Sequence, residues 1–384
     1  MRRLLPALLL VALPASLRAQ SHDGAFIVRL GTDTVAVERF SRGKGEYSVE
    51  QARRVPRTTL WHTHIGLAPD GGVGEIFLMN HSLERMDAPL LASTRLVSRG
   101  DSATVETKRG DSTRTRSLAL GGGAIPSLPQ SFLAYELAAM QLRRSGADSA
   151  SVVMLSPSGD TSSVLVRRVG ADSMTFQLPF FTYRAKVDAD GRISGLYQPL
   201  GTTVERAPDV DVTAIAKTWA ALDAAGRAMG PLSPFDSTTA RVGTARVTVR
   251  YSRPRSRGRE VFGNLVPYDQ VWRTGANAAT VLETDRDLVI GTTPVPAGRY
   301  TLFIIPSRTS STLVISRETT RDGQPLAGTD YDPKQDLARI PMTTRTIAKP
   351  VDQVTIGLVP TRANAATLHV VWDRREMTVP VQVR

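Results

Sequence analysis

Alternation of apolar and polar residues, interrupted at short intervals by glycine-rich turns, is the feature that most constrains the fold of this chain. Two examples are residues 26–30, FIVRL, and residues 103–107, ATVET. Successive side chains of a β-strand point to opposite faces of a sheet, so a period of two is typical of strands with one buried face. Short turns such as Asp190-Gly191 favour antiparallel neighbours. The sequence therefore predicts a mainly β fold.

One helix is predicted inside the first run of strands. Ser127 and Gln130 have the spacing of a capping box. Apolar residues at positions 132, 133, 137 and 140 then fall on one helical stripe, and Gly146 ends the pattern. We expect a curved antiparallel sheet, half-barrel-like in shape, packed on this helix. Such a pattern is faintly similar to lipoprotein-carrier and half-barrel proteins of the bacterial envelope.

A domain boundary is predicted near residue 230. A second short helix, capped by Asp211, precedes residues 226–234, GRAMGPLSP, which hold two glycines and two prolines in nine positions. Strand patterns resume at Thr238 with spacing that suits a β-sandwich or jelly roll. We therefore expect a signal peptide at 1–19, a curved-sheet domain at 20–210, a helix and linker at 211–231, and a sandwich domain at 232–384.

The N-terminus has the order of an export signal. Arg2 and Arg3 precede an apolar run from Leu4 to Leu13, and Ala19 closes a cleavage site. The run is shorter than the roughly 20 residues of a transmembrane helix, so we expect no membrane span after cleavage. The chain also lacks cysteine, which excludes disulfides and thiol catalysis. A periplasmic or secreted protein is predicted.

The chain is basic, with a formal net charge of +12. A basic exported protein has the charge to associate with anionic lipid headgroups or envelope polymers. No run of four basic residues occurs, however, and this favours a well-solvated surface. We expect no nucleic-acid partner.

Residues 253–277 combine arginines, aromatic residues and backbone breakers. Proline or glycine at positions 254, 258, 263, 267 and 275 prevents regular structure. Long irregular loops on a sheet often bind ligands. Guanidinium groups bind carboxylates and phosphates, while aromatic rings offer flat faces to sugars. This pattern predicts a site for an anionic or carbohydrate ligand, or for an envelope component; its residues would be Arg253, Arg259, Tyr268, Trp272, Arg273 and Asn277.

An architectural role for the same loop is the competing interpretation. Trp272 would then plug the sandwich, and Arg273 would pair with a buried acid. Asn277 would adopt a left-handed conformation in a tight turn.

The region from about Pro231 to Arg384 resembles a known family. The resemblance is carried by residues 251–254 (YSRP), 258–263 (GREVFG), 271–277 (VWRTGAN) and 296–300 (PAGRY). These motifs are similar to those of the bacterial domain-of-unknown-function family 2911, which implies no particular activity. The chain departs from the family at Ala278, where members usually carry glutamate, and at Gly328, where a Trp-Gly pair is common.

The sequence leaves open whether the protein is an enzyme. We expect a non-catalytic binding protein of the envelope, without cofactor or metal. The alternative is a hydrolase that uses paired carboxylates such as Glu260, Asp269 or Asp330 as acid and base.

Metal binding has weak support in the sequence. His62 and His64 share one face of a strand, but zinc needs a third ligand, for which His81 and Glu75 are the candidates. No spacing typical of a metal or nucleophile motif occurs.

Overall fold

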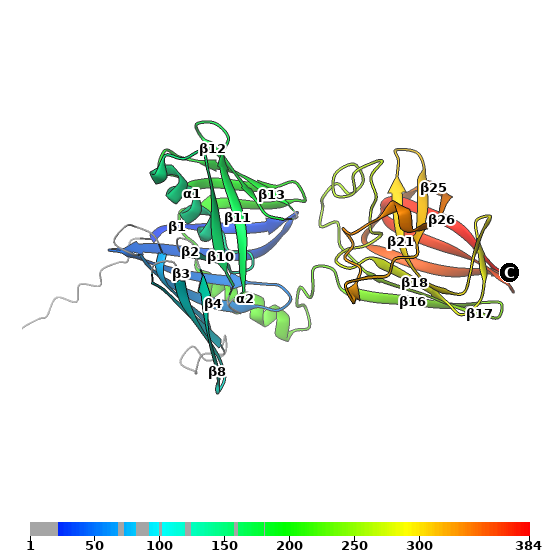
Figure 1. The fold of residues 1–384 in the computed structure, drawn as a ribbon, viewed down its shortest axis with the longest axis horizontal. Coiled ribbons are helices and arrows are strands. Elements are labelled where there is room, and N and C mark those ends of the chain that lie inside the picture. The colour runs from blue at the N-terminus through cyan, green and yellow to red at the C-terminus, as the bar shows by residue number, and fades with distance from the viewer. Residues whose placement is uncertain are drawn as a thin grey trace, which may run out of the picture.

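The chain forms two large β-sheets, each built from one continuous stretch of sequence (Figure 1). The computed structural model describes residues 22–67, 73–81, 92–99, 102–119, 124–156, 160–179 and 181–384. The predicted signal peptide at 1–19 lies outside these ranges. The predicted mainly β architecture is confirmed, with a curved sheet around one helix followed by a second, separate sheet. None of the helices in the described ranges has the length and apolarity to cross a membrane.

The first sheet contains 15 of the described strands, in the order β8-β7-β6-β5-β4-β3-β2-β1-β15-β14-β13-β12-β11-β10-β9. Their neighbours are antiparallel, apart from the parallel pair β9 and β10. The strands are β1 (His22–Leu30), β2 (Asp33–Gly43), β3 (Glu46–Arg53), β4 (Thr59–Leu67), β5 (Val73–His81), β6 (Ala92–Arg99), β7 (Ser102–Arg109), β8 (Ser112–Ala119), β9 (Ala124–Pro126), β10 (Ser149–Leu155), β11 (Thr161–Arg168), β12 (Ser173–Gln177), β13 (Thr182–Val187), β14 (Ile193–Gln198) and β15 (Thr202–Ala207).

Helix α1 (Leu133–Ser145) packs against one face of this sheet, where Leu133 and Leu142 share a hydrophobic cluster with strand residues such as Phe26 and Phe176. Gly146 ends the helix as predicted, with a left-handed φ of 70°.

The predicted capping box at Ser127 and Gln130 is wrong, because the helix begins at Leu133 without a side-chain cap of its own. Glu38 of β2 takes that role. Its Oε1 accepts the N–H groups of Phe132 and Leu133 at 2.7 and 2.8 Å. A carboxylate 94 residues away thus satisfies donors that a local cap would otherwise satisfy.

Helix α2 (Val212–Ala224) covers the other face of the first sheet. Asp211 caps it as predicted, accepting the N–H of Ala214 at 2.8 Å. Its Trp219 and Ala216 pack with Val37 of β2, the neighbour of Glu38 in the sequence. Because adjacent strand residues point to opposite faces, α1 and α2 lie on opposite sides of β2.

The second sheet contains nine of the described strands, in the order β16-β17-β18-β21-β22-β25-β26-β19-β20. The pairing of β25 and β26 shifts register between residues 346 and 355, and β16 contacts β25 from the far end of this order. The sheet therefore folds over on itself as a sandwich (Figure 1). Its strands are β16 (Phe235–Val242), β17 (Ala245–Ser252), β18 (Thr280–Thr284), β19 (Leu288–Ile290), β20 (Thr293–Val295), β21 (Gly298–Pro306), β22 (Ser311–Ser316), β25 (Asp336–Arg362) and β26 (Ala365–Val383).

A small hairpin, β23 (Thr320–Arg321) with β24 (Gln324–Pro325), follows β22. The short 3-10 helix η1 (Pro333–Gln335) then precedes β25, and Asp332 caps it by accepting the N–H of Lys334 at 3.0 Å.

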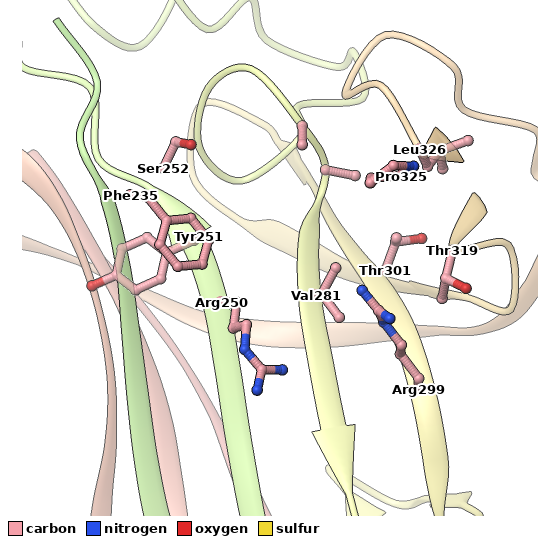
Figure 2. Close-up of a pocket in the computed structure, with 12 residues that line it drawn as sticks. Phe235, Arg250, Tyr251, Ser252, Val281, Arg299, Thr301, Thr319, Pro325 and Leu326 are labelled. Atoms are coloured by element: carbon pink, nitrogen blue, oxygen red, sulfur yellow. The ribbon is translucent and has the colours of Figure 1, made fainter. Parts of the chain in front are cut away.

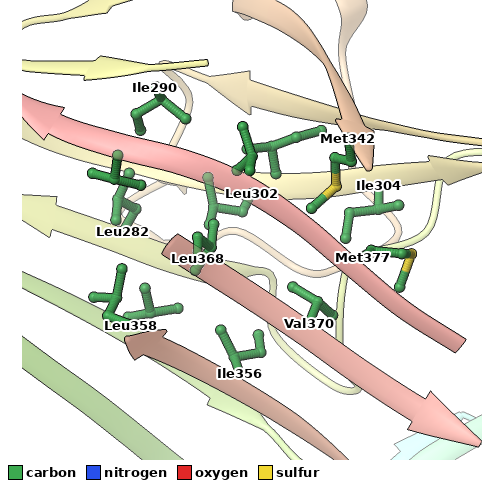
Figure 3. Packing of buried hydrophobic residues seen from close by; sticks show 14 of the residues in the cluster. Leu282, Ile290, Leu302, Ile304, Met342, Ile356, Leu358, Leu368, Val370 and Met377 are labelled. Atoms are coloured by element: carbon green, nitrogen blue, oxygen red, sulfur yellow. The ribbon is translucent and has the colours of Figure 1, made fainter. Parts of the chain in front are cut away.

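The interior of the sandwich is one hydrophobic cluster drawn from both layers (Figure 3). Leu282 and Leu302 come from β18 and β21, while Ile356 and Val370 come from β25 and β26, and each is at most 2% exposed. Full burial of such a side chain contributes about 1.5–3 kcal/mol. This core gives the loops at the sandwich edge a rigid support.

Candidate functional site

The arginine-rich loop, residues 253–279, connects β17 to β18 without forming a strand of its own. Trp272 ties its second half to the sandwich by exchanging backbone hydrogen bonds of 2.8 and 2.9 Å with Ile304 of β21. The loop is therefore irregular, as predicted, and fixed to a strand.

Arg253, at the start of the loop, has its donors occupied by protein groups. Its Nε donates to the carbonyl of Val354 at 2.9 Å, its Nη2 to Thr355 at 3.1 Å, and its Nη1 to Asp236 at 2.9 Å. Its side chain is 27% exposed. The structure thus places this predicted site residue in a bridge between β16 and β25.

Arg257 docks the loop onto the first sheet. Its side chain is only 5% exposed and forms an ion pair with Asp33 at the start of β2. Its carbonyl accepts the N–H of Thr32 at 2.9 Å. Gly31 permits this approach, since a Cβ there would lie 2.1 Å from the Arg257 carbonyl oxygen. The contact joins two segments 224 residues apart.

Arg259 is occupied by backbone carbonyls. Its Nη1 donates to Leu200 in the β14–β15 turn at 2.7 Å, and its other donors reach Ser256 and Arg255 at 2.8 and 2.7 Å. Its aliphatic stem covers Gly201, whose hypothetical Cβ would lie 2.3 Å from Cδ. Burial lowers the pKa of this guanidinium from its usual value. The residue holds the contact between the sheets.

Trp272 fills the sandwich, in keeping with the architectural interpretation. It is 8% exposed and stacks on Trp372 of β26, with ring centroids 5.7 Å apart and planes inclined by 23°. Its indole N–H donates to the carbonyl of Gly275 at 3.2 Å.

Arg273 and Asn277 form the tight turn that follows. Asn277 adopts a left-handed φ of 60°, as that interpretation predicts. Arg273 has no ion pair with the described residues; its Nη1 donates to the Asn277 carbonyl at 3.1 Å, so the expected buried acid is absent from this region. Burial lowers the pKa of Arg273.

Tyr268, one of the six predicted site residues, lines a cleft. The cleft has a volume of about 470 Å³. The loop contributes Glu260, Phe262 and Tyr268; the β21–β22 turn and strands β25 and β26 contribute Arg308, Thr309, Thr344, Arg345, Thr346, Asp373, Arg374 and Arg375. We call it the Tyr268 cleft. Its volume is within the range of small-molecule sites, about 300–1,000 Å³.

Two residues of this cleft, Arg375 and Thr344, have a buried polar side-chain atom without a hydrogen-bond partner among the described residues, and Arg375 is the charged one. It is 9% exposed, and its guanidinium lies 5.0 Å from the ring centroid of Phe262 and 5.7 Å from that of Tyr268. Its Nη2 donates to the carbonyls of Ser307 and Arg308, the latter at 2.8 Å. Its buried Nη1 has no hydrogen-bond partner among the described residues. Burial lowers the pKa of Arg375.

An irregularity of β26 aims Arg375 at the cleft. Asp373 has a φ of 51°, and the pairing with β25 shifts register between its partner Val351 and Thr346, the partner of Arg375. Alternation fails here, so that Arg375, Glu376 and Met377 are all buried. Such bulges redirect side chains, often beside functional sites.

Arg375 was not predicted as a site residue, because it lies on β26, outside the arginine-rich loop. The available signal was the run of four charged residues, Asp373 to Glu376, inside an otherwise apolar strand.

The Tyr268 cleft has an excess of positive charge. Four arginines and two carboxylates line it, which leaves an excess of two. Glu376 does not line the cleft, but its carboxylate forms an ion pair with Arg345 and so offsets one of these charges. The other carboxylate oxygen of Glu376 lies 3.0 Å from Nδ1 of His369. The ion pair and the histidine hydrogen bond hold the pKa of Glu376 below its usual value. The remaining field favours an anion.

Of the three carboxylates of the hydrolase alternative, only Glu260 is among the lining residues of the Tyr268 cleft. Asp269 accepts a hydrogen bond from the hydroxyl of Ser307, and Asp330 lies beside Arg321, which donates to its carbonyl at 3.1 Å. An acid–base pair needs two such groups around one reacting bond.

The histidines considered for zinc are paired with glutamates across the strands. His62 lies 3.0 Å from Glu50, and His64 lies 3.6 Å from Glu46. His62 and then Arg39 lower the pKa of Glu50 to about 2. Over the described part of the chain, no group of three acidic or histidine side chains is placed to hold a metal ion.

Comparisons with known proteins agree with the resemblance of the C-terminal region. Residues 233–381 match the family described as "Protein of unknown function (DUF2911)". No curated protein matches the chain.

Two solved structures show weak likeness. A DUF1089 family protein from Pseudomonas aeruginosa has 15% identity and a TM-score of 0.33, covering 42% of this chain and 89% of its own. A β-barrel-like DUF1849 protein from Brucella abortus has 12% identity and a TM-score of 0.33, covering 48% and 94%.

Proposed function

We propose that this is an exported, non-catalytic envelope protein that binds a small anionic ligand in the Tyr268 cleft. The observation that carries the proposal is the buried Nη1 of Arg375, which lacks a partner among the described residues. Leaving a charged donor buried and unbonded costs about 1–3 kcal/mol or more. A ligand oxygen at this nitrogen would remove that cost.

An anion suits the cleft better than a sugar. The ring of Tyr268, on which a sugar would stack, is already approached by two guanidinium groups, those of Arg308 at 5.3 Å and Arg375 at 5.7 Å from its centroid. Those cations strengthen the attraction for a carboxylate or phosphate group, because guanidinium donors form short, charge-assisted bonds with such oxygens. The remaining apolar wall, Phe262, lies beneath Arg375.

The test is calorimetric titration with inorganic phosphate. Arg375→Met keeps the apolar contacts of the stem but removes the charge. We expect it to weaken binding tenfold or more, about 1.4 kcal/mol. Arg374→Met is the matched control, because Arg374 is exposed, adjacent and also lines the cleft. Equal effects of the two substitutions, or unchanged binding in both, would refute the assignment to Arg375.

Export rests on the order of basic, apolar and small residues in the first 19 positions. Mass spectrometry of the protein from its native host should give a mature N-terminus at Gln20. A protein that still begins at Met1 would contradict export by this signal.

Independent folding of the two sheets is part of the same proposal. The first sheet ends at Ala207 and the second begins at Phe235. Limited proteolysis should cut near residues 226–234 and leave two resistant fragments. Cleavage scattered through both sheets would argue for one continuous unit.

A further inference from the structure

A second pocket lies on the outer face of the sandwich, apart from the Tyr268 cleft (Figure 2). Its volume is about 280 Å³. It is lined by Phe235, Arg250, Tyr251, Ser252, Ala278, Ala279, Val281, Arg299, Thr301, Thr319, Pro325 and Leu326. None of these residues lines the Tyr268 cleft. We call it the Phe235 pocket.

Apolar side chains form most of the Phe235 pocket. Figure 2 shows Val281 at the centre, with the ring of Phe235 on one side and Pro325 and Leu326 on the other. Phe235 is 70% exposed, the highest value among the exposed large hydrophobic residues of the described chain. The side chain of Tyr251 packs in the sandwich core, where its hydroxyl accepts the N–H of Ile356 at 3.0 Å. A ligand that covers Phe235 removes apolar surface from water.

Strand register places charge at one end of this surface. Val281 lies directly opposite Arg250 on one side and Thr301 on the other. One step along the same face of β18, Glu283 lies opposite Arg299. Apolar and charged groups therefore follow each other along a single face of the sheet.

The charged end has one positive charge in excess. Arg250 and Arg299 both pair with the single carboxylate of Glu283, Arg299 at 3.5 Å. The side chain of Arg299 is 51% exposed, so its guanidinium has freedom to turn toward a ligand. Asp236 is engaged by Arg253 and does not line the pocket.

We infer that the Phe235 pocket binds a monoanionic amphiphile, with its alkyl chain over Val281 between Phe235 and Leu326 and its carboxylate at Arg299. Charge complementarity selects this occupant: the excess of one positive charge matches one carboxylate, and the apolar row beyond it matches an alkyl chain. A neutral alkyl compound would leave the excess charge unpaired, and a cationic one would be repelled by it.

The experiment compares octanoate, octanol and octylamine by calorimetric titration of the full-length mature protein. We expect octanoate to bind at least tenfold more tightly than octanol, and octylamine to bind most weakly. Arg299→Gln should remove the preference for octanoate while octanol binding stays unchanged. Phe235→Ser should weaken both ligands. Thermal unfolding checks that each variant is folded.

Ala278→Glu provides a second test that does not touch the arginines. Ala278 lines the pocket and is exposed, so a glutamate there is accommodated and adds a negative charge beside the ligand. It should lower the affinity for octanoate more than that for octanol. Ala276→Glu, in the same turn but outside the pocket lining, is the control.

Three results would overturn the inference. They are equal affinities for octanoate and octanol, octanoate binding that survives Phe235→Ser, and a wild-type dimer that Phe235→Ser converts to a monomer, which would make the pocket an interface between two copies. Arg375→Met should leave octanoate binding intact, and phosphate should not compete with octanoate. These controls separate failure at this pocket from failure at the Tyr268 cleft.

Discussion

The two halves of the arginine-rich loop, residues 253–259 and 260–279, differ in how the arginines that they contain or contact are bonded. In the first half, residues 253–259, every guanidinium nitrogen of Arg253 and Arg259 donates a hydrogen bond to a protein acceptor. The second half, residues 260–279, contacts Arg375 of β26 through the rings of Phe262 and Tyr268, and Nη1 of Arg375 lacks an acceptor among the described residues. Arginine donors that are all bonded to protein acceptors leave none for a ligand, so in this region only Arg375 offers one.

We expect the most severe loss of stability from breaking the ion pair of Arg257, which is buried, with Asp33, which is 38% exposed. Arg257→Met leaves Asp33 without its partner and removes the Nη1 hydrogen bond. We expect a loss of unfolding free energy of about 2–3 kcal/mol, measured by urea denaturation. Asp33→Asn, which keeps a hydrogen-bond acceptor at that position, should cost less. If Arg257→Met changed nothing, the first half would not hold the sheets together.

The unfolding free energies of the Arg253→Met and Arg375→Met variants test this comparison directly. Arg253→Met removes three hydrogen bonds and leaves Asp236, which is 40% exposed, without its ion-pair partner. We therefore expect the unfolding free energy to fall by about 1.5–3 kcal/mol.

Arg375→Met should cost less than about 1 kcal/mol, because its lost carbonyl bonds are offset by relief of the buried, unpartnered nitrogen. Thermal denaturation ranks the two variants. If Arg375→Met proved the more damaging of the pair, Arg375 would be architectural.

Low pH should weaken the contacts that Asp352 makes with the first half of the arginine-rich loop. Burial opposes ionisation of Asp352, yet hydrogen bonds from Ser256, the N–H of Arg257 and the side chain of Arg255 hold its pKa below the usual 3.8. A carboxyl group with a depressed folded-state pKa contributes stability above its unfolded pKa and loses it as pH falls through the folded value. Unfolding free energy should therefore drop more between pH 5 and pH 3 in the wild type than in Asp352→Asn. Parallel pH profiles would contradict this role.

The smallest effect is expected at Arg273, in the second half. Its Nη1 binds the carbonyl of Asn277, which also accepts the N–H of Gly328 at 3.0 Å and so stays satisfied without it. Arg273→Ala should cost about 0.5 kcal/mol of stability, the low end for one hydrogen bond, because the acceptor keeps another donor. A loss of about 3–5 kcal/mol in denaturation would reveal the buried acid that the architectural interpretation predicted.

Much of the fold could be predicted from local pattern, because strand alternation and glycine turns act over a few residues. The end of α1 at Gly146 and the cap of α2 at Asp211 are such local signals. The start of α1 could not be predicted in this way. Its donors are satisfied by Glu38, and only the folded sheet brings that carboxylate to the helix.

The candidate site, too, could be predicted only in part from the sequence. Composition indicated the loop and Tyr268, which does line the cleft. It could not separate Trp272, which packs on Trp372 in the core, from a residue available to a ligand. The aim of Arg375 depends on the bulge at Asp373, which the strand pattern does not specify.

A crystal structure of the wild-type protein with sodium selenate at neutral pH tests the central claim most directly. Selenate has the oxygens of a phosphate-like anion, and its selenium can be located unambiguously by anomalous scattering. We expect a selenate oxygen within hydrogen-bond distance of Nη1 of Arg375, inside the Tyr268 cleft. An Nη1 bonded to a protein acceptor or to water, with selenate bound only elsewhere, would contradict it.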